Sequence, residues 1–80
     1  MMYVYVLESE RRPGFRYKGV TRDLPARVAR HNDGEVPSTA PYRPWRLTLF
    51  IAFEEDSRAF AFERYLKSGS GHAFAKKHFW

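Results

Sequence analysis

The first part of the chain contains two segments whose hydrophobic and polar patterns are typical of β-strands. Tyr3-Val4-Tyr5-Val6-Leu7 is an aromatic and β-branched run, and Arg12-Pro13-Gly14 after it favours a turn. The next segment has the two-residue period of a strand, with Phe15, Tyr17 and Gly19 set against Arg16, Lys18 and Val20. The pattern predicts an antiparallel hairpin whose neighbouring strands carry Tyr5 and Tyr17 on one face.

The period changes to that of a helix after residue 21. Thr21-Arg22-Asp23 supplies N-capping side chains, and Pro25 is tolerated in a first helical turn. Leu24 to Asn32 is therefore predicted to be a helix that ends before Asp33-Gly34.

The remaining segments complete the predicted fold. Gly34 to Pro44 is expected to be an irregular loop, and Arg46 to Glu54 a strand buried on at least one face. Ser57 to Lys67 has helical spacing, Ser68-Gly69-Ser70-Gly71 is expected to break that helix, and His72 to Phe79 to form a short final one. The order β-β-α-β-α-α predicts an α+β fold with a three-stranded antiparallel sheet flanked by helices.

Glu63 lies within the hydrophobic stripe of the second long helix. The stripe consists of apolar residues at helical spacing, namely Ala59, Phe62 and Leu66. A carboxylate turned toward a core is costly unless a cation, a metal or strong donors meet it. The alternative is a surface pair between Glu63 and Lys67 one turn later, worth about 0.3 kcal/mol. Both interpretations are open at this point.

Composition limits the chain to one small domain. The 80 residues, 44% of them hydrophobic, are enough for a single core, so we expect one domain over residues 1–80. The chain has no cysteine, which excludes a thiol nucleophile and a thiolate metal site. It also lacks an apolar run of about 18 residues and the basic start of a secretion signal, so we expect a soluble cytoplasmic protein without a membrane partner.

Basic residues outnumber acidic ones. The chain has 14 Lys and Arg against 9 Asp and Glu, a formal net charge of +5 that favours polyanionic partners such as nucleic acid. These basic residues are spread along the chain instead of forming a tail, which is typical of a folded basic face.

A series of short motifs runs through nearly the whole chain in one order. They are Tyr3-Val4-Tyr5, Tyr17-Lys18-Gly19, Asp23 to Asn32, Ser38-Thr39 with Pro44-Trp45-Arg46-Leu47, and Glu63 to Gly69. Together they resemble the GIY-YIG endonuclease domain, especially its small single-domain bacterial members. Tyr3 stands where the family's first glycine would be, and Lys18 replaces the isoleucine. The resemblance implies hydrolysis of a phosphodiester with a single divalent metal ion.

The resemblance also implies roles for individual residues. By this analogy Glu63 binds the cation, and Mg²⁺ or Mn²⁺ suits such a hard oxygen ligand. Arg27 holds the scissile phosphate through its planar fork of donors. Tyr5 is the candidate general base and Tyr17 orients water or phosphate, with the two roles interchangeable at this stage. His31 assists near the nucleophile.

Each assignment has an ordinary structural alternative that the sequence leaves open. Arg27 is also explained as a surface helix residue, the strand tyrosines as packing residues, and His31 as a structural histidine. Lys18 and Lys67 are candidates for phosphate contact, with solvated lysines as the alternative. Gly19 is expected to permit close approach of backbone or substrate.

The predicted function is a metal-dependent endonuclease acting on DNA, with RNA as the less favoured substrate. One alternative is a basic nucleic-acid-binding module that has lost useful catalysis. Another is an interaction domain that docks a protein partner through the aromatic end Phe79-Trp80. The sequence leaves the oligomeric state open, homo-oligomers included.

Overall fold

The computed structural model describes residues 1–80, and its elements follow the predicted order with one added 3₁₀ turn, η1. The elements are β1 (Met2–Ser9), β2 (Arg16–Thr21), α1 (Leu24–Asn32), η1 (Ala40–Tyr42), β3 (Trp45–Phe53), α2 (Asp56–Lys67) and α3 (Gly69–His78). The predicted α+β class is confirmed. None of the helices is both long enough and apolar enough to cross a membrane.

β1 is the central strand of an antiparallel sheet with the order β2-β1-β3. Tyr5 lies opposite Gly19 of β2 on one side and Phe50 of β3 on the other, so these positions share one face of the sheet. A register shift between Val6 and Leu7 interrupts the pairing with β3. The predicted hairpin is confirmed, and β1 has neighbours on both edges.

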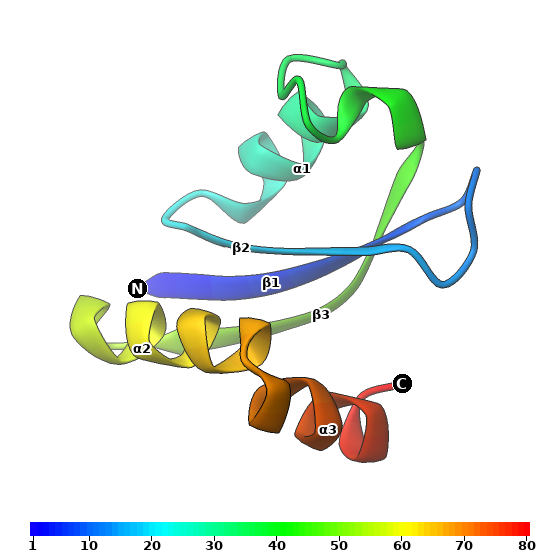
Figure 1. Cartoon of the computed structure of the whole chain (residues 1–80). Coiled ribbons are helices and arrows are strands. Elements are labelled where there is room, and N and C mark those ends of the chain that lie inside the picture. Colours follow the sequence, from blue (N-terminus) through cyan, green and yellow to red (C-terminus); the bar gives the residue numbers. More distant parts are fainter.

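Helices cover both faces of the sheet (Figure 1). α1 lies on one face, above a buried cluster of Tyr5, Leu7, Leu24 and Trp45. α2 and α3 lie on the other face, where the buried cluster consists of Met2, Val4, Ala59, Leu66 and Ala75. Alternate residues of β1 therefore belong to separate cores, and the sheet separates two layers that can each contribute to its edge.

Side-chain caps explain where α1 and α3 begin. The Asp23 carboxylate accepts a hydrogen bond from a backbone N–H three residues on, and α1 has the predicted bounds. The predicted break between the last two helices is confirmed at Ser68, where the backbone is extended, but α3 begins at Gly69 instead of the predicted His72. The hydroxyl of Ser68 accepts from the N–H of Gly71 at 3.1 Å and caps α3, so the two glycines belong to the first turn of that helix.

Hydrogen bonds from side chains hold the segment between α1 and β3. The amide of Asn32 donates to the carbonyl of Trp45 at 3.0 Å and accepts from its N–H. The indole of Trp45 donates to the carbonyl of Thr39 at 2.9 Å. Gly34 has a φ of +78°, which other residues rarely adopt, so the chain reverses just after α1. These contacts fix Thr39 beside the end of α1.

Candidate active site

The side chain of Tyr5 crosses the edge strand β2 at Gly19. A Cβ atom at Gly19 would lie 2.5 Å from the Tyr5 hydroxyl oxygen and 2.6 Å from its Cζ, closer than atoms can approach. The close approach expected at this glycine is made by the protein's own phenol. Tyr5 is fully buried, so its hydroxyl is held inside the fold.

A chain of hydrogen bonds starts at the Tyr5 hydroxyl. This group lies 2.9 Å from Nε2 of His31 and accepts a hydrogen bond from Nε of Arg27 at 3.4 Å. Nδ1 of His31 lies 2.8 Å from Oγ1 of Thr39, whose hydroxyl donates to the carbonyl of Val36. Thr39 therefore accepts from Nδ1–H, which leaves Nε2 to accept from the Tyr5 hydroxyl. This network assigns His31 as neutral, with its proton on Nδ1.

Burial and neighbouring arginines control the ionisation of these groups. Desolvation, followed by the charges of Arg27 and Arg30, holds the pKa of His31 below its ordinary value. Desolvation also raises the pKa of Tyr5, and the hydrogen bond from Arg27 opposes that shift. The same hydrogen bond raises the pKa of Arg27. At neutral pH, Tyr5 and His31 are uncharged and Arg27 carries the positive charge.

The lowered pKa of His31 predicts how stability depends on pH. Histidine in an unfolded chain titrates at about pH 6.5, whereas the pKa of His31 in the folded chain is lower. Between these two pKa values the unfolded chain binds more protons than the folded chain. The contribution to the free energy of unfolding is fully present above about pH 6.5 and is lost as the pH falls through this window.

Urea unfolding at a series of pH values measures this effect. We expect His31→Gln to flatten the decline in the free energy of unfolding below about pH 6.5. His72→Gln is the control, because His72 is exposed, and it should keep the wild-type decline. Parallel profiles for wild type and His31→Gln would contradict the assignment of a buried neutral imidazole.

Tyr17 lies beside the network and, unlike Tyr5, is partly exposed. Its ring centroid is 6.2 Å from that of Tyr5 and 4.8 Å from that of His31. After the larger effect of the Tyr5 hydrogen bond, the Tyr17 phenol also helps to raise the pKa of Arg27. Four residues named from the sequence therefore gather on the α1 side of β2.

Glu63 lies on α2, which covers the opposite face of the sheet. Its side chain is only 14% exposed and forms an ion pair with Lys67, whose side chain is 54% exposed. The inward position and the Lys67 pair, which were alternatives at the level of sequence, occur together. After desolvation and the nearer groups, the charge of Glu63 contributes to raising the pKa of Tyr5, so the two layers are within electrostatic range.

A magnesium-type ion at Glu63 would have a single protein carboxylate as its ligand. Lys67 contacts Oε2, which leaves Oε1 as a hard donor. No group of three or more His, Cys, Asp or Glu side chains gathers in the chain, so water and phosphate would supply the other ligands, as Mg²⁺ accepts. The ammonium of Lys67 competes with such an ion for the carboxylate.

A cationic cluster lies on the α2 side of β2. Desolvation, followed by the charges of Lys67 and Arg16, lowers the pKa of Lys18. Trp80 covers two of these cations, with Cζ of Arg16 4.5 Å and Nζ of Lys18 5.7 Å from its ring centroid. Lys18 and Lys67, both named from the sequence, are thus electrostatic neighbours.

The sequence interpretation missed three residues that shape the site. Thr39 orients His31, Trp80 covers Lys18, and Arg30 lies beside Arg27 on α1. The Ser38-Thr39 motif was the available signal for Thr39, and the three-residue spacing from Arg27 was the signal for Arg30. Nothing in the local pattern connected Trp80 with β2.

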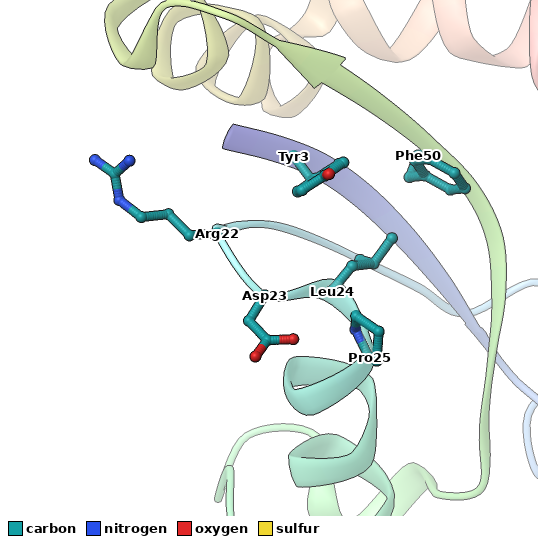
Figure 2. Close-up of a pocket in the computed structure, with 6 residues that line it drawn as sticks. All are labelled: Tyr3, Arg22, Asp23, Leu24, Pro25 and Phe50. Carbon is teal, nitrogen blue, oxygen red and sulfur yellow. The ribbon is translucent and has the colours of Figure 1, made fainter. Parts of the chain in front are cut away.

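Two surface pockets flank the start of α1. The first, with a volume of about 310 Å³, is here named the α1 groove and is lined by Val20, Thr21, Asp23, Ala26, Arg27 and Arg30. The second, of about 260 Å³, is lined by Tyr3, Arg22, Asp23, Leu24, Pro25 and Phe50 (Figure 2). In Figure 2 the Arg22 side chain extends away from Phe50. Only the α1 groove includes a residue of the hydrogen-bond network.

Residues 1–77 of the chain match the family model described as the GIY-YIG catalytic domain. The chain belongs to the GIY-YIG family. The match covers the motifs from Tyr3-Val4-Tyr5 to Glu63 and confirms the resemblance seen in the sequence. GIY-YIG domains form a nuclease family that acts on nucleic acid, and its members generally use divalent metals. No curated protein sequence matches the chain.

Proposed function

We propose that this GIY-YIG domain is a divalent-metal-dependent endonuclease that hydrolyses phosphodiester bonds in DNA, with RNA as the less favoured substrate. The observation that carries the proposal is that Glu63, on α2, lies within electrostatic range of the Tyr5 hydroxyl, which accepts a hydrogen bond from Arg27 on the opposite side of the sheet. The side chain of Tyr5 passes over β2 at Gly19, so the network lies beside the edge strand. A phosphodiester lying over the edge of β2 can reach both Arg27 and Glu63, and the net charge of +5 favours its binding.

Each residue acts at a different part of the substrate in this proposal. Tyr5 holds Nε of Arg27, so the two terminal nitrogens can oppose the charge that grows on the phosphate oxygens. A divalent ion held by Glu63 would supply a Lewis acid for the same oxygens. Lys18 and Lys67 add positive charge on the α2 side, where flanking phosphates can lie.

The different exposures of the tyrosines favour Tyr17 as the group that meets the attacking water. Tyr5 is fully buried, and its hydroxyl is already shared between His31 and Arg27. Tyr17 is partly exposed and lies beside Arg27, so its hydroxyl is placed to contact an attacking water next to the phosphate that Arg27 would hold. Tyr5 then positions Arg27 and His31, the reverse of the first assignment made from the sequence.

Cleavage by the purified chain tests the proposed function. With Mg²⁺ or Mn²⁺ the chain should cut at least one of a panel of duplex, single-stranded, flap and branched DNAs, with matched RNAs alongside, and EDTA should stop the reaction. Tyr17→Phe keeps the ring and removes the hydroxyl, so it should stay folded and lose about 10²–10⁴-fold in cleavage rate.

Tyr65→Phe is the matched control for this substitution. Tyr65 is exposed on α2 and belongs to none of the site contacts, so its variant should cut at the wild-type rate. Wild-type cleavage by Tyr17→Phe would remove that hydroxyl from the chemistry. Absence of cleavage on every substrate with either ion would refute nuclease activity for this chain.

One observation favours a nucleic-acid-binding module without catalysis as the second candidate. The ammonium of Lys67 contacts Oε2 of the carboxylate that would hold the metal and so competes with the ion for that charge. Metal-independent binding of DNA, with no cleavage in the same panel, would select this alternative.

The third alternative from the sequence was a protein-docking role for the aromatic end of the chain. Phe79 and Trp80 pack against the core cluster that contains Leu66, and Trp80 also covers Arg16. These two side chains therefore stabilise the fold and the edge of β2, which removes the observation on which the docking role depended.

A further inference from the structure

The α1 groove carries positive charge that the proposed cleavage chemistry does not use. Arg27 and Arg30 lie three positions apart on α1, so their Cβ atoms are about 5–6 Å apart on one helix face. Arg27 belongs to both the hydrogen-bond network and the groove, whereas Arg30 lines only the groove. Arg30 therefore extends the cationic surface beyond the position proposed for the scissile phosphate.

The guanidinium of Arg30 is available to a ligand. Its side chain is 52% exposed, and the nearest carboxylate, that of Glu35, lies 3.9 Å from its Nε, outside normal hydrogen-bond range. A pair of this geometry at the surface contributes little to stability, so an incoming phosphate can replace it.

The other polar groups of the groove are already engaged. The hydroxyl of Thr21 is shared with the backbone of Asp23, at 3.1 Å from its N–H and 3.3 Å from its carbonyl. The carboxylate of Asp23 accepts from the N–H of Ala26 at 3.2 Å and caps α1. The groove is lined by two arginines and one carboxylate, so its net charge is positive. The arginines are also the donors in the groove that can bind a ligand.

We propose that the α1 groove is a second phosphate-binding subsite, in which Arg30 holds the phosphate next to the one at Arg27. Its ligand is the backbone of a nucleic-acid strand, so the contact fixes the register of the strand and carries no base information. The inference rests on the proposed function in one respect, namely that the strand bound in the groove is the strand that is cut. Binding in the groove does not itself require cleavage.

Salt dependence of binding tests the subsite without any cleavage. Fluorescence anisotropy with a labelled 12-nucleotide single strand and its duplex, in EDTA, gives the slope of log affinity against log salt. Arg30→Gln removes one phosphate contact and should reduce the magnitude of that slope by about one. By the same relation, affinity should fall roughly tenfold at about 50 mM salt, equally for unrelated base sequences.

Two further variants separate a local contact from general charge. Arg58→Gln makes the same change in net charge, but Arg58 is 76% exposed on α2 and lines neither pocket, so its slope should match wild type. Asp23→Asn keeps a good N-cap and removes the negative charge of the groove, so it should tighten binding. An unchanged slope in Arg30→Gln, or an equal loss in Arg58→Gln, would overturn the subsite.

Failure of the subsite can be told apart from failure of the proposed activity. If the chain cuts DNA, Arg30→Gln should raise KM several-fold and leave kcat nearly unchanged, because the lost contact is equal in the ground and transition states. Salt-sensitive binding that depends on Arg30, without cleavage, would refute the nuclease and retain the subsite. A chain that binds neither probe at about 50 mM salt would overturn the subsite directly.

Discussion

Glu63→Gln is expected to lower the cleavage rate by at least about a hundredfold while nucleic-acid binding survives. Glutamine nearly preserves the shape of the side chain but removes the charge that the proposed metal ion requires. Glu63 is 14% exposed and its charge is met only by the exposed Lys67, so removing this charge from the metal-free protein should leave the free energy of unfolding unchanged or raise it. Single-turnover cleavage and anisotropy measure the two effects separately.

The matched control for this variant is Glu54→Gln. Glu54 is exposed just after β3 and forms no ion pair, so the same chemical change there should leave cleavage at the wild-type rate. Thermal unfolding with and without Mg²⁺ adds a second readout, because an ion bound by the folded chain raises Tm and Glu63→Gln should abolish that rise. Wild-type cleavage by Glu63→Gln would show that Glu63 serves only as the partner of Lys67.

Gly19→Ala is expected to damage both stability and activity. The new methyl group would lie 2.5 Å from the Tyr5 hydroxyl oxygen and 2.9 Å from Cε1, and the ring cannot move without breaking its contacts with His31 and Arg27. Such overpacking costs about 1–3 kcal/mol in the free energy of unfolding. Because displacement of Tyr5 releases Arg27, cleavage should fall even where the variant is fully folded.

Gly69→Ala provides the comparison for this substitution. A methyl group at Gly69, in the first turn of α3, would meet nothing within 4 Å, so alanine there should be neutral or stabilise by about 0.4–1 kcal/mol. Urea unfolding measures the stability of both variants, and a cleavage assay measures their activity. Similar stability and activity for Gly19→Ala and Gly69→Ala would contradict the close contact of the Tyr5 ring with Gly19 of β2.

The elements of the fold could be predicted where local chemistry alone decides them. Asp23 and Pro25 start α1, and Gly34 permits the reversal after it, so the predicted bounds of this helix agree with the structure. The sequence correctly predicts a break after Lys67 but places the start of α3 too late, because the backbone freedom of Gly69 and Gly71 suggests a longer non-helical segment. In the structure a cap from Ser68 outweighs their low helix propensity, and the packing of α3 on α2 stabilises the turn.

The candidate site could be predicted only as a set of residue types. Tyr5, Tyr17, Arg27 and His31 came from motifs, but the tautomer of His31 depends on Thr39, which lies in a loop without periodicity. Asn32 and Trp45 place that loop through contacts that no sequence spacing encodes. The burial of Tyr5 is likewise a tertiary property, since it depends on the partner strand having glycine at position 19.

β1 has an open edge whenever the fold is incomplete. A short turn joins β1 to β2, and their pairing includes Tyr3 with Thr21. β1 also pairs with β3, as Met2 does with Phe53, but α1 and the loop that follows it separate these two strands along the chain. Closing the longer segment costs more chain entropy, so the hairpin forms more readily. A chain with only the hairpin exposes an apolar strand edge to other chains, and aggregation during synthesis or refolding should begin there.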